Sequence, residues 1–135
     1  MRQALTPALA LDYVRELSAD VRAGIVLDSA GAPLAGPPQL AGPALALLAA
    51  AGKALELEAV SEQGVVCAVR SPEHSAVAVC GRFAIAGVVR QDLRAAIAAL
   101  EGRPGAWEVL EGRRSGALEG PAQALISAVQ RGFEA

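Results

Sequence analysis

Histidine and cysteine, two residue types that commonly carry catalysis or bind metals, are scarce in this 135-residue sequence. His74 is the only histidine, and it follows Glu73 in a predicted turn, where we expect it to be solvent-exposed. Two cysteines and one histidine fall short of the four ligands of a structural zinc site. The glycines match neither a phosphate-binding loop nor a dinucleotide-binding fingerprint. We therefore expect no catalytic, cofactor-binding or metal site, and a binding module rather than an enzyme.

Aromatic residues are also rare, at 3% of the chain, whereas 53% of the residues are hydrophobic and 31 are alanine. A core of alanine, leucine and valine lets helices and a sheet approach closely, but each contact buries little area. Burial contributes about 25 cal/mol per Å², so a second copy that covers further apolar surface would stabilise such a chain. A small-molecule sensor of the PAS or GAF type would need a pocket with convergent polar groups, for which this composition offers little.

Neither the charge nor the apolar segments indicate binding to nucleic acid or to a membrane. The formal net charge is −2, the pI is near 5.4, and the arginines are spread along the chain. No apolar run approaches the roughly 18–20 residues that span a bilayer, and the longest candidate, Ala44–Ala51, has eight. The N-terminal residues contain no apolar core of a signal peptide. The sequence predicts a cytoplasmic protein.

The first 35 residues predict a helix followed by a tight hairpin. Thr6 is suited to cap a helix and Pro7 to occupy its first position. Residues 23–27 predict a buried strand, and Asp28 and Gly31 then suit a turn that closes a bulged hairpin onto residues 32–35. The helix is recognised by one apolar stripe, formed by Ala10, Val14, Leu17 and Val21.

The rest of the domain predicts a helix, three strands and a closing helix. The second helix is clearest over Pro43–Ala51, and its start is left open between Pro38 and Pro43 because proline is tolerated only near a helix start. The three strands are predicted at 54–61, 64–70 and 75–80, and Leu55 and Leu57 share one face of the first strand. Residues 87–100 form the last helix, with its apolar stripe at Val89, Leu93, Ile97 and Leu100.

The domain is predicted to cover residues 1–102, and residues 103–135 form a C-terminal extension. The extension contains Trp107, which we expect to dock on the domain, and a polar, glycine-rich stretch. Residues 121–133 predict a helix that packs on a neighbour or a partner.

The order of elements resembles the roadblock domain, also called the dynein light-chain roadblock type, in its bacterial branch associated with small GTPases. The resemblance covers about Leu9 to Leu100 and rests on LALDYVREL, VRAGIVLDSAGAPLA, the alanine- and leucine-rich second helix, VAVCG and VVRQDLRAAIAAL. It implies an α/β (α+β) fold, an α-β-β-α-β-β-β-α sandwich with a five-stranded, mainly antiparallel sheet.

The resemblance also implies a function. Family members dimerise through the second helix and the third strand, here 43–51 and 54–61, and partner small Ras-like GTPases. We therefore expect a non-enzymatic homodimer that scaffolds or regulates such a GTPase. The predicted dimer interface consists of Leu45, Leu48, Leu55 and Leu57. The alternatives are a signalling or structural adaptor with a non-GTPase partner, and a PAS- or GAF-type sensor.

Two further sets of residues have open roles. Arg70, Arg82, Arg90 and Arg94 lie near predicted strand ends or on the last helix, where one of them could serve as an arginine finger for a GTPase; the simpler interpretation is a solvated face. Cys67 and Cys80 are expected to be buried, reduced filler residues. A four-residue loop over 72–75, which we favour, would place them opposite each other, whereas a three-residue loop would place Cys67 opposite Val79.

Overall fold

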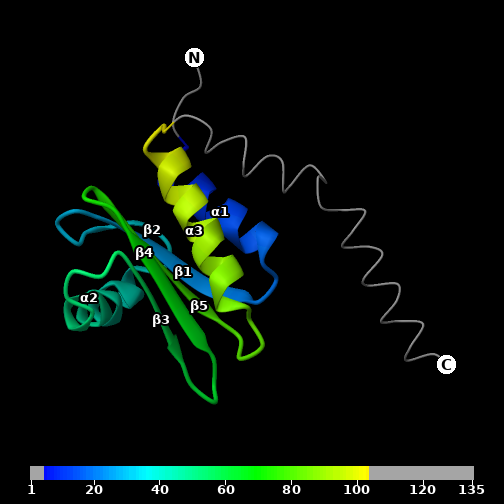
Figure 1. Ribbon diagram of the computed structural model, residues 1–135. Coiled ribbons are helices and arrows are strands. Elements are labelled where there is room, and N and C mark those ends of the chain that lie inside the picture. The colour runs from blue at the N-terminus through cyan, green and yellow to red at the C-terminus, as the bar shows by residue number, and fades with distance from the viewer. Residues whose placement is uncertain (1–4, 104–135) are drawn as a thin grey trace.

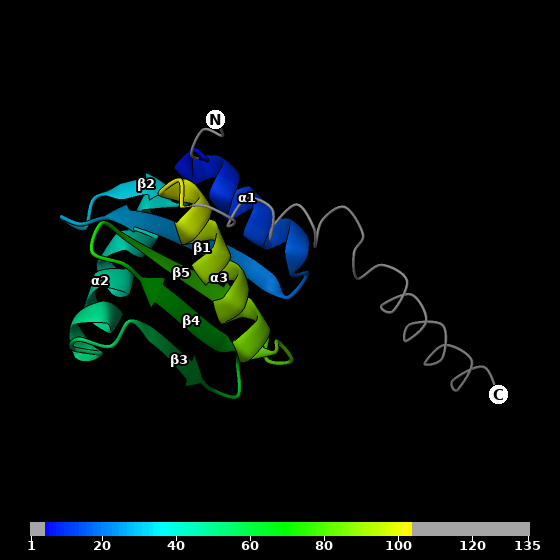
Figure 2. The ribbon, with the colours of Figure 1, turned by 45° about the horizontal axis from the view of Figure 1, so that its top comes forward.

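The computed structural model describes residues 5–103 and contains one five-stranded antiparallel sheet with helices on both faces (Figures 1 and 2). The predicted extension, its helix at 121–133 and Trp107 lie outside the described residues. The elements are α1 (Pro7–Leu17), β1 (Val21–Asp28), β2 (Pro33–Ala35), a 3-10 turn η1 (Pro38–Leu40), α2 (Ala41–Ala50), β3 (Glu56–Val60), β4 (Val65–Arg70), β5 (His74–Cys80) and α3 (Ala86–Leu100). The predicted fold class and order of elements are thus confirmed.

Local signals explain where the first elements begin and end. Thr6 caps α1, because its Oγ1 accepts a hydrogen bond from the backbone N–H of Leu9 at 3.2 Å. In the turn between β1 and β2, the carboxylate of Asp28 accepts from the backbone N–H groups of Ala30 and Ala32. Gly31 closes this turn with a φ of 87°. The first helix and the bulged hairpin therefore follow from their capping and turn residues, as predicted.

The start of α2 lies between the two positions left open by the sequence. The 3-10 turn ends at Leu40, and α2 runs from Ala41, so that Pro43 is its third residue. Proline is tolerated there because the N–H groups of the first turn have no partner within the helix. The helix ends before Gly52, which has a φ of 64°.

The strand order in the sheet is β2-β1-β5-β4-β3. Strands β1 and β5 pair in the sheet, although β2, α2, β3 and β4 all lie between them in the chain. A close approach of β2 to β1 requires glycine at position 36, which has a φ of 93°. A Cβ at Gly36 would lie 2.2 Å from the carbonyl oxygen of Gly24.

The two faces of the sheet are covered unequally. Helices α1 and α3 pack against each other and cover one face, where they bury the larger core, including Val14, Val26 and Leu93 (Figure 2). Of the helices in the described residues, α2 is the one on the opposite face, where it buries a smaller cluster around Leu27 and Leu48. We call this second face of the sheet the α2 face.

The predicted register between β4 and β5 is wrong. Ser71 and His74 pair directly, with the backbone N–H of Ser71 donating to the carbonyl of His74 at 2.8 Å, and Cys67 lies opposite Ala78. The turn is two residues long, shorter than either loop considered, and this shift of two residues moves Cys80 to a position opposite Val65. A two-residue shift preserves the face, so both thiols remain buried beneath α3 and reduced.

Candidate interaction surface

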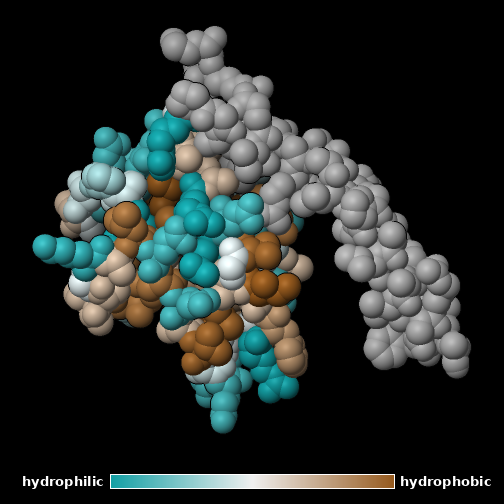
Figure 3. Space-filling model, viewed as in Figure 1, coloured by the Kyte–Doolittle hydropathy of each residue, from teal (hydrophilic) through white to brown (hydrophobic). Residues whose placement is uncertain are grey.

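The α2 face carries an apolar wall that α2 covers only in part. The strand residues that point to this side include Ile25, Leu27, Val66, Ala68 and Val77. From α2, only Ala44 and Leu48 are buried against them. Viewed as in Figure 1, the surface over α2 is largely in apolar colours (Figure 3). Val66 and Val77 of the sheet also line an open pocket beside α2, so the wall continues beyond the helix that covers it.

The uncovered part of the wall forms a shallow apolar pocket of about 250 Å³ between α2 and the strands. Leu47 and Pro43 of α2 lie on one side of it, and Val66 and Val79 of the sheet on the other. Val79 is 36% exposed although β5 is a central strand. An apolar residue on a central strand is normally covered by a second layer, and at this pocket residues 5–103 provide none.

Strand β3 is the edge strand beside this pocket. The opposite edge, β2, is three residues long and begins with Pro33, two features that limit pairing with another strand. β3 has five residues and no proline, so its outer backbone groups can form a ladder. Of the two sheet edges, β3 is therefore the one suited to pairing.

Ion pairs hold β3 against α3. The carboxylate of Glu56 lies 3.3 Å from Nη1 of Arg90 and 3.0 Å from Nη1 of Arg94, and Glu58 lies 3.9 Å from Nε of Arg90. These contacts neutralise the two carboxylates that would otherwise repel a second acidic strand. Arg90 and Arg94 are thereby engaged in ion pairs with residues of their own chain.

Arg70 joins the end of α2 to the start of β3. Its guanidinium donates to the carbonyl oxygens of Leu48 at 3.2 Å, Ala54 at 2.6 Å and Gly52. Its backbone N–H donates to the carbonyl of Leu55 at 2.8 Å. The last carbonyls of a helix have no partner within the helix. Here Arg70 satisfies the carbonyl of Leu48, in the last turn of α2, and fixes the following loop through the carbonyls of Gly52 and Ala54. Arg70 is therefore a positioning residue for both parts of this surface.

The four residues predicted to form a dimer interface occupy different positions. Leu55 is 65% exposed and Leu45 is 41% exposed, so both are available to a partner. Leu57 is partly buried against the smaller cluster, and Leu48 is 6% exposed and lies within that cluster. The structure brings Leu48 and Leu57 together beneath α2, whereas Leu45 lies near Gly31 in the first hairpin.

The expectation that His74 is a solvent-exposed turn residue is wrong. His74 is half-buried, and its Nδ1 lies 2.8 Å from Oε2 of Glu101 at the end of α3. The hydroxyl of Ser71 donates to the same oxygen at 2.5 Å. The carboxylate lies between the hydroxyl and the imidazole, so His74 is not placed to remove the proton of Ser71, as nucleophilic catalysis would require.

The same cluster contains groups of the kind that bind metal ions. One ligand atom each of Glu73, His74 and Glu101 lies within 4.8 Å of the others. However, Nδ1 of His74 and Oε2 of Glu101 are already bound to each other, and Ser71 occupies the same oxygen. Burial raises the pKa of Glu101, but the hydrogen bonds from Ser71 and His74 and the charge of Arg103 outweigh it, so the pKa is lowered overall. This geometry favours a structural role over metal binding: Ser71, His74 and Glu101 join the β4–β5 turn to the end of α3.

The sheet with two helices on one face, one on the other and an open edge strand defines a small α/β sandwich domain. No family model matches the sequence. No curated protein matches it either. Within residues 5–103, no helix is both long and apolar enough to cross a membrane.

Solved structures identify the fold. A Roadblock/LC7 domain from Streptomyces avermitilis matches with a TM-score of 0.62 and 10% identity, over 74% of this chain and 97% of that one. The gliding protein MglB from Thermus thermophilus matches with a TM-score of 0.52 and 21% identity, over 68% and 83% of the two chains. An MglB in a tetrameric arrangement matches with a TM-score of 0.52 and 20% identity, over 74% and 90%. The chain has the Roadblock/LC7 fold, as the sequence resemblance predicted.

Proposed function

We propose that two copies of this chain pair through α2 and the edge of β3, joining their sheets. The observation that carries this proposal is the apolar wall of the α2 face, which α2 covers only in part and which ends at the edge strand suited to pairing. A second α2 lying across the pocket would cover Val79 and the exposed Leu45. Leu55 would then lie at the junction of the two sheets, while Leu48 and Leu57 hold α2 and β3 in place.

We further propose that the dimer scaffolds or regulates a small Ras-like GTPase and performs no reaction of its own. The sequence resemblance implies such a partner, and the likeness to MglB structures supports the same branch of the fold. Three of the four arginines considered as fingers are held by groups of this chain: Arg70 by carbonyls, and Arg90 and Arg94 by Glu56. A regulatory role that acts through binding agrees with these contacts, and we place it in the cytoplasm.

The dimer is tested by sedimentation equilibrium from ~1 to ~100 μM, a range in which a micromolar dimer dissociates measurably. Leu55→Glu is expected to weaken it at least about 100-fold, because two-fold symmetry introduces the change twice and each buried leucine contributes about 1.5–3 kcal/mol. Leu9→Glu is the matched control, since Leu9 is exposed on α1, on the other side of the sheet. A monomeric wild-type protein at ~100 μM would overturn the proposal.

The partner is tested with a Ras-like GTPase encoded in the same genome, prepared with GDP and with a non-hydrolysable GTP analogue. Titration calorimetry is expected to show binding that depends on the nucleotide, and GTP turnover is measured with and without this chain. A stable dimer that binds neither form would favour the alternative, an adaptor whose partner is not a GTPase.

A further inference from the structure

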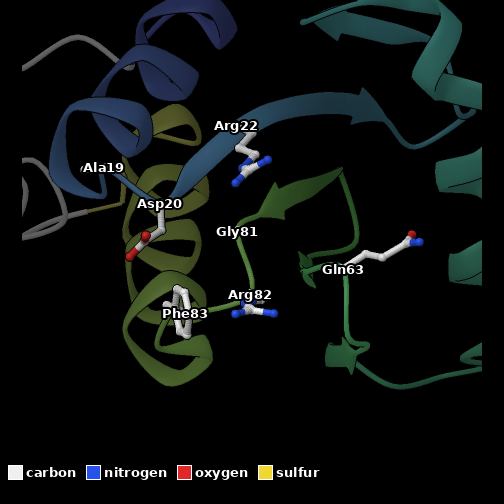
Figure 4. Close-up of a pocket in the computed structure, with 7 residues that line it drawn as sticks. All are labelled: Ala19, Asp20, Arg22, Gln63, Gly81, Arg82 and Phe83. Carbon is white, nitrogen blue, oxygen red and sulfur yellow. The ribbon is translucent and has the colours of Figure 1, made fainter.

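A second surface lies at the end of the sheet where β1 begins and β5 ends. The pairing of β1 with β5 is interrupted there: Val21 lies opposite Cys80 and Ala23 opposite Val79, so Arg22 is an extra, unpaired residue. Such a bulge redirects a side chain out of the regular alternation of the strand. Figure 4 shows the guanidinium of Arg22 directed from β1 toward the loop that follows β5.

The loop after β5 receives this guanidinium at a glycine. A Cβ at Gly81 would lie 3.4 Å from both Nε and Nη2 of Arg22, so the guanidinium lies over the bare backbone. The backbone N–H of Gly81 donates to the carbonyl of Asp20 at 2.9 Å, which fixes the loop beside the start of β1. Next in the chain, the guanidinium carbon of Arg82 lies 4.7 Å from the centre of the Phe83 ring.

Two cations and an aromatic ring thus line one pocket, and no residue in the described part of the chain forms an ion pair with either cation. Within residues 5–103, neither Arg22 nor Arg82 forms a salt bridge, in contrast to Arg90, Arg94 and Arg103. Asp20 also lines the pocket, but Figure 4 shows its carboxylate pointing away from the guanidinium of Arg22. The Phe83 ring is 78% exposed.

The size of the pocket indicates what it can accept. Its volume is about 240 Å³, below the roughly 300–1,000 Å³ of sites that enclose small molecules. It can hold a side chain inserted from another protein. Arginine and aromatic residues are the types that contribute most to protein–protein interfaces.

We propose that Arg22, Arg82 and Phe83 form a docking surface for an acidic segment of a partner protein. Carboxylates of the segment bind the guanidinium groups of Arg22 and Arg82, and a neighbouring apolar side chain packs on Phe83. Charge complementarity selects this occupant, because two unpaired guanidinium groups repel a basic segment. This surface lies at the strand ends and not on the α2 face, so the proposal goes beyond the proposed function and does not depend on it.

The experiment uses the full chain labelled with ¹⁵N and a blocked peptide of sequence EELDF, with its uncharged counterpart QQLNF as the comparison. NMR titration is expected to shift the side-chain Nε–H signals of Arg22 and Arg82 and the backbone amide of Phe83 with the acidic peptide only. Arg22→Gln and Arg82→Gln are each expected to weaken binding about tenfold. Arg15→Gln, which removes an exposed charge from α1, is the matched control and leaves binding unchanged.

Three results would overturn the proposal. The first is the absence of shifts at Arg22 and Arg82. The second is equal binding by Arg82→Gln and the wild type. The third is an equal response to inorganic phosphate at the same concentration, which would indicate a general anion site. Sedimentation of Arg22→Gln and Arg82→Gln, both expected to dimerise normally, separates this outcome from any failure of the proposed dimer.

Discussion

Replacing Arg70 with methionine tests the claim that one side chain joins α2 to β3. Methionine keeps an apolar chain of similar reach but removes every guanidinium N–H. The carbonyl oxygens of Leu48, Gly52 and Ala54 then lose their shared donor. The expected result is a less stable domain in which the end of α2 is no longer fixed.

The magnitude depends on how far water can replace the lost donors. A hydrogen bond to a charged group contributes about 1.5–3 kcal/mol. The carbonyls of Gly52 and Ala54 are solvent-exposed and recover most of this from water, whereas the bond to Leu48 is partly buried. We therefore expect a loss of about 2–3 kcal/mol, or about 8–20 °C in Tm for a domain of this size.

Urea and thermal unfolding followed by circular dichroism measure this change. Arg15→Met is the matched control, because Arg15 is exposed on α1 and a surface substitution changes stability by at most about 0.5 kcal/mol. A loss of less than ~0.5 kcal/mol for Arg70→Met would refute the claim. Sedimentation of the same variant is expected to show a weaker dimer, since both proposed pairing elements adjoin this arginine.

Three further predictions concern Glu101, the two cysteines and Gly36. The pKa of Glu101 is lower in the folded protein than its ordinary value of 4.5. The ionised carboxylate therefore stabilises the fold fully above pH 4.5, the ordinary value, and this contribution is lost as the pH falls through the folded-state pKa. In urea titrations, the difference in unfolding free energy between the wild type and Glu101→Gln should shrink over that pH range. Cys67 and Cys80 are 0% and 2% exposed, so a thiol reagent cannot reach either; it should modify neither in the native protein and both after denaturation without reductant. Fewer than two reactive thiols after denaturation would indicate a disulfide. Gly36→Ala should cost about 2–4 kcal/mol, because the new Cβ meets the backbone of β1 at a positive φ, whereas Gly42→Ala, in open space on α2, should be neutral or stabilising in calorimetry.

Elements marked by local chemistry could be predicted from the sequence. Thr6 and Pro7 indicate the start of α1, and Asp28 and Gly31 indicate the first hairpin, because each acts on residues within a few positions of itself. The alternation of Leu55 and Leu57 with two glutamates likewise predicted a half-exposed strand, and β3 runs over Glu56–Val60. Together with the periodicity of the apolar residues, these signals were sufficient for the order of elements, and the fold class followed from the resemblance to the roadblock domain.

Contacts between distant segments could not be predicted in this way. Arg70 reaches carbonyls 16 to 22 residues away, and His74 meets Glu101 across 27 residues, so neither pattern leaves a local signal. The register of β4 with β5 depended on a turn two residues shorter than the favoured loop. The burial of Leu48 was missed because the periodicity of an almost wholly apolar helix does not distinguish its inner side from its outer side.

The pairing of β1 with β5 has a consequence for synthesis of the protein. β1 is the first strand to be made but needs β5, the last, as its main partner, and β5 is complete only at Cys80. At about 5–20 residues per second, translation of the intervening segment takes roughly 3–10 s. During this time the nascent chain carries β1 without its partner strand, together with the apolar α2 region. The five-stranded sheet cannot form until β5 has been made. The order of the strands therefore makes completion of the sheet wait for β5, the last of its strands to be synthesised.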